Sequence, residues 1–141
     1  MKVKDLMIGD WVVFHDSGYA SDGTVWKKDR VCQIDSIDTD VRVKWYDEDG
    51  YEEEWPNVSV MHLSPIPLTP EILEKNGWVK DLYSDESYDN EELECLSLWV
   101  GEDSKNKWWW HVGVDLVTPI NYVHELQHAL RLCGKEKEIE L

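Results

Sequence analysis

Three prolines within six residues divide the chain into two parts. Ser64-Pro-Ile-Pro-Leu-Thr-Pro70 is the one Pro-rich stretch in the sequence. Proline fixes its own φ and biases the residue before it away from helix, so this stretch should be extended and stiff. We therefore expect two small modules in the chain of 141 residues: residues 1–64 and residues 70–141, joined by a junction at 65–69.

The first module has the pattern of short strands and no helical periodicity. Residues 41–46 alternate cleanly, with Val41, Val43 and Trp45 on one face, and Asp47 to Gly50 is a strong turn signal after them. The expected strands are 8–14, 30–37, 41–46, 51–55 and 58–63, with a polar loop at 18–23. About five short strands in a segment of this size predict a small SH3-like β-barrel. The opening Ile8-Gly-Asp-Trp-Val12 resembles the Gly-Asp-x-Val start of many such barrels.

The second module begins with a well-delimited helix. Thr69 is a good N-cap, Pro70 falls at the first helical position, and Gly77 stands where a helix C′ residue belongs. These signals predict a helix over 70–76. Strands are expected at about 78–83, 93–100 and 108–117, and residues 81–94 should form an acidic loop.

A second helix is expected over 119–133, with Thr118 as N-cap, Pro119 at N1 and Gly134 at C′. At ~100° per residue its apolar face carries Tyr122, Val123, Leu126, Leu130 and Cys133, and the opposite face carries His124, His128 and Arg131. The tail 135–141 alternates and could add a short edge strand. The expected fold class is α+β, an SH3-like small β-barrel followed by a small antiparallel sheet packed with two helices.

This second helix also contains a match to a catalytic motif. His124-Glu125-Leu126-Gln127-His128 fits H-E-x-x-H, in which two His bind zinc and the Glu acts as general base of a peptidase. The periodicity places the His pair beside Arg131 on the polar face, and no His or Asp follows His128 to serve as third ligand. Zinc-peptidase activity is therefore the weaker alternative. We assign no catalytic, cofactor-binding or metal-binding residue and expect no enzyme.

Aromatic residues offer two candidate binding surfaces. Trp108-Trp109-Trp110 could form a stacking platform or fill the core, and packing is the more common use of large aromatic side chains. Four residues of the first module, Trp45, Tyr46, Tyr51 and Trp55, could line a cage for a cationic ligand near the acids of 47–54.

Charge limits the possible partners. Thirty acidic against fourteen basic residues give a formal charge of −16, which repels phosphate backbones and anionic lipid. Direct nucleic-acid or membrane binding is not expected, whereas a protein partner is compatible, and so is a charge that only maintains solubility. The acid clusters at 47–54 and 81–94 raise a further alternative, a DNA-mimic inhibitor of a host protein.

Three cysteines without a CxxC pattern, Cys32, Cys95 and Cys133, indicate reduced thiols in a cytoplasmic protein, each a small core residue. No apolar run reaches transmembrane length and the N-terminus has no signal-peptide pattern.

The junction Pro65-Ile-Pro-Leu-Thr-Pro-Glu-Ile-Leu-Glu-Lys-Asn-Gly-Trp78, the C-terminal Tyr122-Val-His-Glu-Leu-Gln-His and the opening Lys4-Asp-Leu-x-Ile-Gly-Asp-Trp-Val resemble a group of small proteins from gut Bacteroidetes and their phages and mobile elements. The group has no assigned function. Its matching helix has Val-His-Gln-Leu-Gln-Asn, so Glu125 and His128 are departures from its pattern. The resemblance implies a non-enzymatic binding or accessory protein of phage or mobile-element origin.

Overall fold

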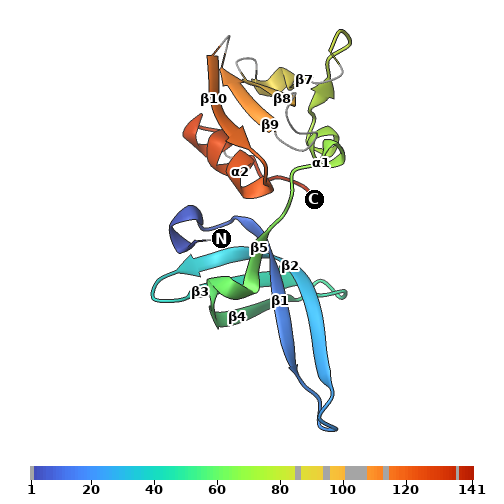
Figure 1. Ribbon diagram of the computed structural model, residues 1–141, viewed down its shortest axis with the longest axis vertical. Coiled ribbons are helices and arrows are strands. Elements are labelled where there is room, and N and C mark those ends of the chain that lie inside the picture. Colours follow the sequence, from blue (N-terminus) through green and yellow to red (C-terminus); the bar gives the residue numbers. More distant parts are fainter. Residues whose placement is uncertain (1, 85–86, 94–95, 101–107, 113–114, 136) are drawn as a thin grey trace. The chain divides into compact units, whose positions relative to one another are not determined.

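The computed structural model describes residues 2–84, 87–93, 96–100, 108–112, 115–135 and 137–141. The chain divides into two compact units, Met1–Ile66 (unit 1) and Pro67–Leu141 (unit 2), and the division falls inside the Pro-rich stretch. The fold is α+β, with antiparallel sheets in both units and both α-helices of the described residues in unit 2 (Figure 1). None of the helices in the described ranges has the length and apolarity that crossing a membrane requires.

Unit 1 is a five-stranded antiparallel sheet with the strand order β4-β3-β2-β1-β5. The last strand returns to pair with the first, through Val12↔Pro65, Val13↔Ser64 and Phe14↔Leu63. Its elements are η1 (Val3–Asp5), β1 (Trp11–Tyr19), β2 (Val25–Ile37), β3 (Val41–Tyr46), β4 (Glu52–Val58), η2 (Val60–His62) and β5 (Leu63–Pro65). Strands β4 and β5 are the edges, and no strand pairing among the described residues closes the sheet into a barrel.

Two sequence-based predictions for unit 1 need correction. The strands expected at 8–14 and 30–37 are β1 and β2, which pair without interruption from Trp11↔Gln33 to Tyr19↔Val25. The polar loop expected at 18–23 is therefore confirmed over 20–23, between the two strands, but not at 18–19. The strand expected over 58–63 is instead the end of β4, the 3₁₀ turn η2 and the start of β5. Polar residues extend the hairpin because antiparallel pairing needs only the backbone, which the hydrophobic pattern does not report.

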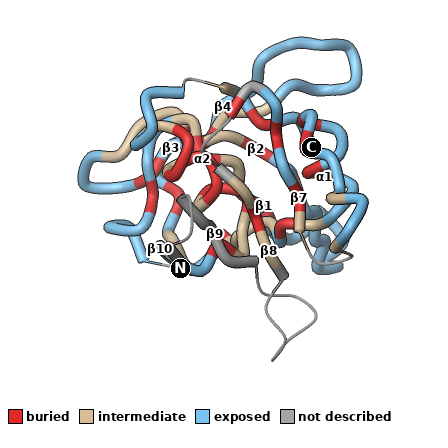
Figure 2. Tube along the Cα trace, turned by 90° about the horizontal axis from the view of Figure 1, so that it is seen from above, coloured by how far each residue is buried: buried red, intermediate tan, exposed pale blue. Residues whose placement is uncertain are grey.

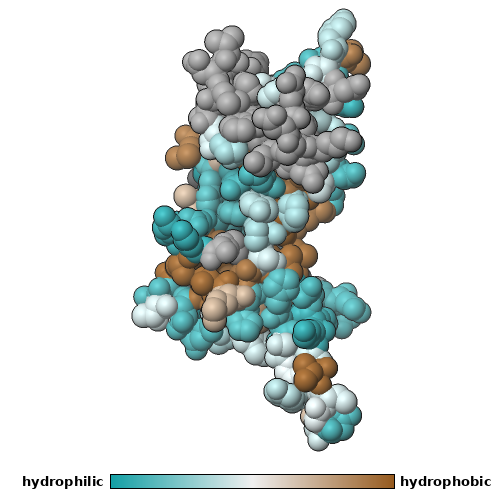
Figure 3. Space-filling model, in the orientation of Figure 1, coloured by the Kyte–Doolittle hydropathy of each residue, from teal (hydrophilic) through white to brown (hydrophobic). Residues whose placement is uncertain are grey.

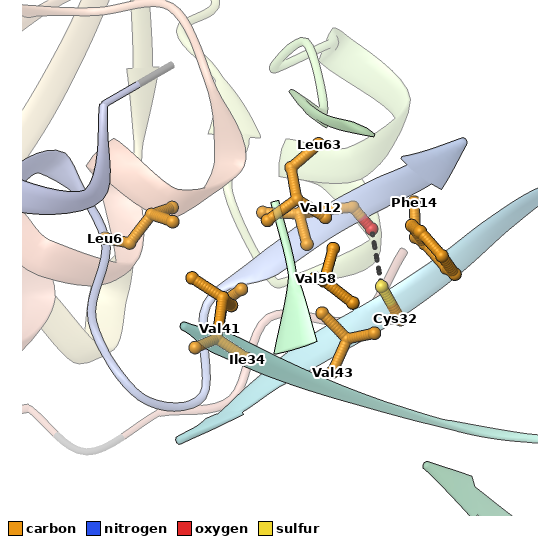
Figure 4. Close-up of a cluster of buried hydrophobic side chains, with 9 residues drawn as sticks. All are labelled: Leu6, Val12, Phe14, Cys32, Ile34, Val41, Val43, Val58 and Leu63. Atoms are coloured by element: carbon orange, nitrogen blue, oxygen red, sulfur yellow. Dashed lines mark hydrogen bonds between the residues drawn. The ribbon is translucent and has the colours of Figure 1, made fainter. Parts of the chain in front are cut away.

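The core of unit 1 consists of side chains from one face of the sheet, together with Leu6. Val12 and Phe14 of β1 meet Cys32 and Ile34 of β2, and the Cys32 thiol donates to the Val12 carbonyl at 3.7 Å (Figure 4). The remaining members of the cluster are Leu6, Val41, Val43, Val58 and Leu63. Burial raises the pKa of the Cys32 thiol to about 12, because removing a thiolate from water is unfavourable.

Unit 2 is a second antiparallel meander, with the strand order β10-β9-β8-β7-β6. Its elements are α1 (Pro70–Lys75), β6 (Val79–Lys80), β7 (Ser87–Asp89), η3 (Glu91–Leu93), β8 (Leu96–Val100), β9 (Trp108–Val112), β10 (Asp115–Ile120) and α2 (Val123–Leu132). Buried stretches lie on the strands of both units and on α2, while the connecting segments are largely exposed (Figure 2). Strand β7 lies inside the segment that the sequence predicted to be an acidic loop.

The first helix follows its sequence signals. Thr69 caps α1 by accepting from the Ile72 N–H at 3.4 Å, and Pro70 is its first residue. Gly77 adopts a left-handed φ of 83°, which a glycine reaches without steric strain, and the chain then turns so that the Trp78 N–H donates to the Leu73 carbonyl at 3.0 Å.

The second helix begins later than predicted. Thr118 and Pro119 are not a cap and a first helical residue, because both belong to β10, where Pro119 pairs with Trp109. The segment 108–117 is accordingly two strands, β9 and β10, and not one. Strand β10 is a sheet edge, a position that tolerates proline because the ladder does not need its N–H.

The C-terminal tail forms no strand in its described residues, and the Asn76 side chain binds its backbone. Asn76, which is 5% exposed, uses its amide as a backbone mimic: Nδ2 donates to the Glu140 carbonyl at 2.7 Å, and Oδ1 accepts from the Glu140 N–H at 2.8 Å. The same Nδ2 donates to the Ile72 carbonyl at 2.7 Å, at the end of α1. Ile139, beside this clamp, is 1% exposed.

Candidate functional site

The H-E-x-x-H residues lie on α2, but not as the periodicity predicted. His124 is buried, at 5% exposure, and not on a solvated face. Its ring stacks on Tyr122 with centroids 5.8 Å apart and meets His128 edge-on at 5.7 Å. Gln127 and Ala129 are buried as well, so α2 is buried on more than one side. The prediction of one buried and one solvent-exposed face was wrong for this reason.

Glu125 forms hydrogen bonds with the backbone at the start of α2. Its Oε2 accepts from the Asn121 N–H at 2.7 Å and from the Tyr122 N–H at 3.2 Å, which satisfies donors at the start of α2 that have no intrahelical acceptor. A carboxylate held this way stabilises the helix terminus. Within the described ranges, no three His, Cys, Asp or Glu side chains gather to hold a metal ion.

The four aromatic residues proposed as a cage do not converge. Trp45 and Trp55 share one face of the sheet, because Trp45 pairs with Glu53 and Trp55 lies two residues further along β4. Tyr46 points to the other face, where its hydroxyl donates to Glu52 Oε2 at 3.0 Å, and the Arg30 guanidinium already covers the Trp45 ring at 5.0 Å. The side chains of Trp108, Trp109 and Trp110 lie outside the described part of the structure.

The acids of β4 are distributed over both faces of the strand. Glu54 pairs with Arg42 at 3.5 Å and Glu52 with Lys44 at 3.9 Å, while Glu53, between them, points to the opposite face. The acidic cluster 47–54 is therefore partly neutralised.

A concave site does occur in unit 1, where β1, β4 and η2 meet. We call it the Trp55 pocket. It has a volume of about 240 Å³ and is lined by Phe14, Asp16, Trp55, Val58, Ser59 and His62, among others. The Trp55 ring packs on Phe14 with centroids 6.1 Å apart and planes tilted by 48°. Asn57, with a left-handed φ of 59°, is the second-last residue of β4, and both β4 and η2 contribute residues to the opening.

The polar side of this pocket is preorganised. The Asp16 carboxylate is 6% exposed and accepts a hydrogen bond from the Arg30 guanidinium, the same group that stacks on Trp45. A buried carboxylate needs such a partner to remain charged. The pocket therefore has one aromatic wall and one neutralised acid, and an incoming cation would have to compete with Arg30.

His15, which also lines the Trp55 pocket, belongs to a Ser–His–Asp array. The Ser64 hydroxyl is 2.7 Å from His15 Nε2, and His15 Nδ1 is 2.7 Å from Asp29 Oδ1. A nucleophile, a base and an orienting acid in this order are the signature of nucleophilic catalysis. However, the residue after Ser64 is Pro65, which has no N–H to offer an oxyanion, and the side chains of His15 and Asp29 are 45% and 69% exposed. The array instead connects β2, β1 and β5.

Neither site is predictable from the sequence pattern near its residues. Asp29 and Ser64 are 14 and 49 residues from His15, and Trp55 is far from Phe14 along the chain, so only strand register brings them together. A clean alternation in β1, with Phe14 and Asp16 on one face and His15 on the other, was the one available signal. No family model, curated protein or solved structure matches this chain.

Proposed function

We propose that this chain is a non-enzymatic binding protein, an accessory protein of phage or mobile-element origin acting in the cytoplasm, and that it holds a segment of a partner protein at the Trp55 pocket. In this proposal unit 1 is an SH3-like β-barrel. The strand order, the return of β5 to β1 and the 3₁₀ turn before β5 support that assignment.

The exposure of Trp55 is the observation that carries the proposal. Its neighbour across the strands, Val43, is fully buried, whereas Trp55 itself is 46% exposed at the mouth of a pocket. A large aromatic side chain that is half exposed in a concave site is the usual anchor of a protein interface.

The size and charge of the site indicate the class of ligand. A volume of about 240 Å³ is below the range of roughly 300–1,000 Å³ that holds small-molecule ligands and cofactors, and it suits one apolar side chain. The formal charge of −16 opposes nucleic acid and anionic lipid. A side chain presented by a partner protein fits both conditions.

Selection from a random-peptide display library with the full chain as bait tests the proposal. Peptides enriched for an apolar residue should bind, and Trp55→Ala should weaken them about thirtyfold, since interface anchors contribute about 2 kcal/mol or more. His62→Ala, at the rim of the same pocket, is a second variant that leaves the Phe14–Trp55 contact intact and should weaken binding by a smaller factor.

The matched control is Tyr83→Ala, which removes an aromatic side chain that is 96% exposed in unit 2 and should leave affinity unchanged. An NMR spectrum of each variant establishes that it is folded. Enriched peptides that bind folded Trp55→Ala as well as they bind the original chain would exclude the Trp55 pocket as the binding site.

A further inference from the structure

The Trp55 pocket continues onto a projecting hairpin. We call residues 17–28 of β1 and β2 the hairpin arm. Its strands have ladder partners only in each other, because β5 pairs with β1 no further than Phe14 and β3 pairs with β2 only from Gln33 onward. The arm extends beyond the other strands of unit 1 (Figure 1), and its visible surface is mainly hydrophilic to intermediate in hydropathy, with one small hydrophobic patch (Figure 3).

One aromatic ring is fixed on the arm. Trp26 pairs with Gly18, and a Cβ at Gly18 would lie 2.8 Å from the Trp26 ring. The indole therefore packs directly against the glycine backbone, which holds it in place. Trp26 remains 40% exposed, so it presents a positioned ring and not a buried one.

This ring lies on the same face of the hairpin as Phe14 and Asp16, two residues that line the Trp55 pocket. The β1–β2 register has no bulge, so Phe14, Asp16 and Gly18 point to one side and His15 and Tyr19 to the other. Trp26, opposite Gly18, is then four residues along β1 from Phe14. At about 3.3 Å per residue, the two apolar points are roughly 13 Å apart.

An available cation lies between these two points. Lys28 is opposite Asp16 in the register, and therefore on the same face. The Asp16 carboxylate is occupied by Arg30, and no carboxylate of the described residues forms an ion pair with Lys28. The face thus presents an apolar pocket, a cation and an aromatic ring in a row along β1.

We infer that the partner segment is an extended peptide with an apolar, an acidic and a second apolar side chain at alternate positions, i, i+2 and i+4. Alternate side chains of an extended chain point to one side, and four residues span about 13 Å, the spacing of the two apolar points. The inner apolar side chain enters the Trp55 pocket, the acid pairs with Lys28, and the outer apolar side chain covers Trp26. Strand β5 flanks β1 only as far as Phe14, and the three inferred contacts of the peptide are all made with side chains of the face that carries Lys28 and Trp26.

The inference rests on the proposed function, and synthetic peptides separate the two. The probe is acetyl-Ser-Leu-Ser-Glu-Ser-Leu-Ser-amide, titrated into the ¹⁵N-labelled full chain. One comparison peptide has Lys for the Glu, and another has its two Leu residues adjacent. The probe should bind at least fivefold more tightly than either, with shifts at both Trp55 and Trp26.

Adjacent residues on the arm provide matched controls. Trp26→Ala and Lys28→Glu should weaken the probe about tenfold and about threefold. Tyr19→Ala and Lys27→Glu alter the other face of the same strands and should leave binding unchanged. The Lys28→Glu chain should in turn prefer the comparison peptide that carries Lys.

The outcomes distinguish the inference from the proposed function. If Trp55→Ala abolishes binding of the probe while Trp26→Ala and Lys28→Glu do not weaken it, the pocket binds the partner and the extended motif is wrong. Equal affinity of all three peptides also overturns the motif. If neither the probe nor any library peptide shifts the Trp55 resonance, the pocket itself is refuted.

Discussion

Removing the Asn76 amide should release the C-terminal tail. Asn76→Ala deletes three hydrogen bonds of 2.7, 2.7 and 2.8 Å, two of them to the backbone of Glu140 and one to the Ile72 carbonyl at the end of α1. No other side chain of the described residues clamps both backbone groups of Glu140. The substitution therefore tests whether one side chain holds the tail in place.

The expected loss follows from two alternatives. If the tail stays docked, the polar groups left unsatisfied cost about 1–3 kcal/mol. If the tail lifts off, the Glu140 backbone is hydrated, but Ile139, which is 1% exposed, loses about 1.5–3 kcal/mol of burial. The two costs are similar, and the chain adopts the smaller one. We therefore expect Asn76→Ala to destabilise the docked tail by about 2 kcal/mol.

Native-state amide exchange measures the destabilisation of the tail residue by residue. A local measurement is needed because a chain with two units need not unfold in one step. The Glu140 amide should lose its protection by about thirtyfold, while the Trp78 amide, bonded to Leu73 in the turn after α1, stays protected. Lys75→Ala, which removes an exposed contact to the Leu141 carbonyl, is the control and should change exchange only slightly. Unchanged protection of Glu140 in Asn76→Ala would refute the clamp.

Four further outcomes follow from the burial or the hydrogen bonds of individual residues. Leu126→Ala should lower the free energy of unfolding by about 3 kcal/mol in urea denaturation, whereas Leu132→Ala, at a position 81% exposed, should change it by less than about 0.5 kcal/mol; equal effects would contradict the assigned helix face. Glu125→Ala should cost about 1 kcal/mol through the lost capping contacts, and far-UV circular dichroism against temperature would show an unchanged midpoint if the carboxylate had no such role. At pH 8, iodoacetamide followed by mass spectrometry should modify exposed Cys133 and spare Cys32 in the folded chain. Folding raises the pKa of the Cys32 thiol from 9.0 to about 12. The stability that comes from burying the neutral thiol is therefore complete below pH 9 and is lost as the pH rises from 9 to 12. We expect the urea midpoint of the original chain to fall across this pH range and that of Cys32→Ala to stay flat.

Local signals predicted those elements whose ends are defined by adjacent residues. Thr69, Pro70 and Gly77 delimit α1 within one short segment, and its observed bounds follow them. The alternation of Val41, Val43 and Trp45 located β3 at its observed bounds. In each case the determining interactions lie within a few residues, where propensity, capping and periodicity act.

The same kind of signal was misleading where a longer-range partner competed. Thr118 and Pro119 have the pattern of a helix start, yet pairing with β9 draws both into β10, and Glu125 then caps the helix from within. Cys133 was expected in the core because it falls on the apolar stripe, but it is the C-cap of α2 and is exposed. Cys32 is buried as predicted, and Cys95 lies outside the described residues.

The sequence by itself therefore determined the α+β class, the bounds of α1 and β3 and the buried positions Val123, Leu126 and Leu130 of α2, because helix caps and side-chain periodicity are local properties of a chain. Only the tertiary structure decided where α2 begins, which side chains hold the tail and which residues form the Trp55 pocket. Phe14, Trp55 and His62 come from two strands and a 3₁₀ turn, and Trp26 joins their face through the hairpin register. Strand pairing between distant segments sets such neighbours, and nothing in the sequence near any one of them specifies the others.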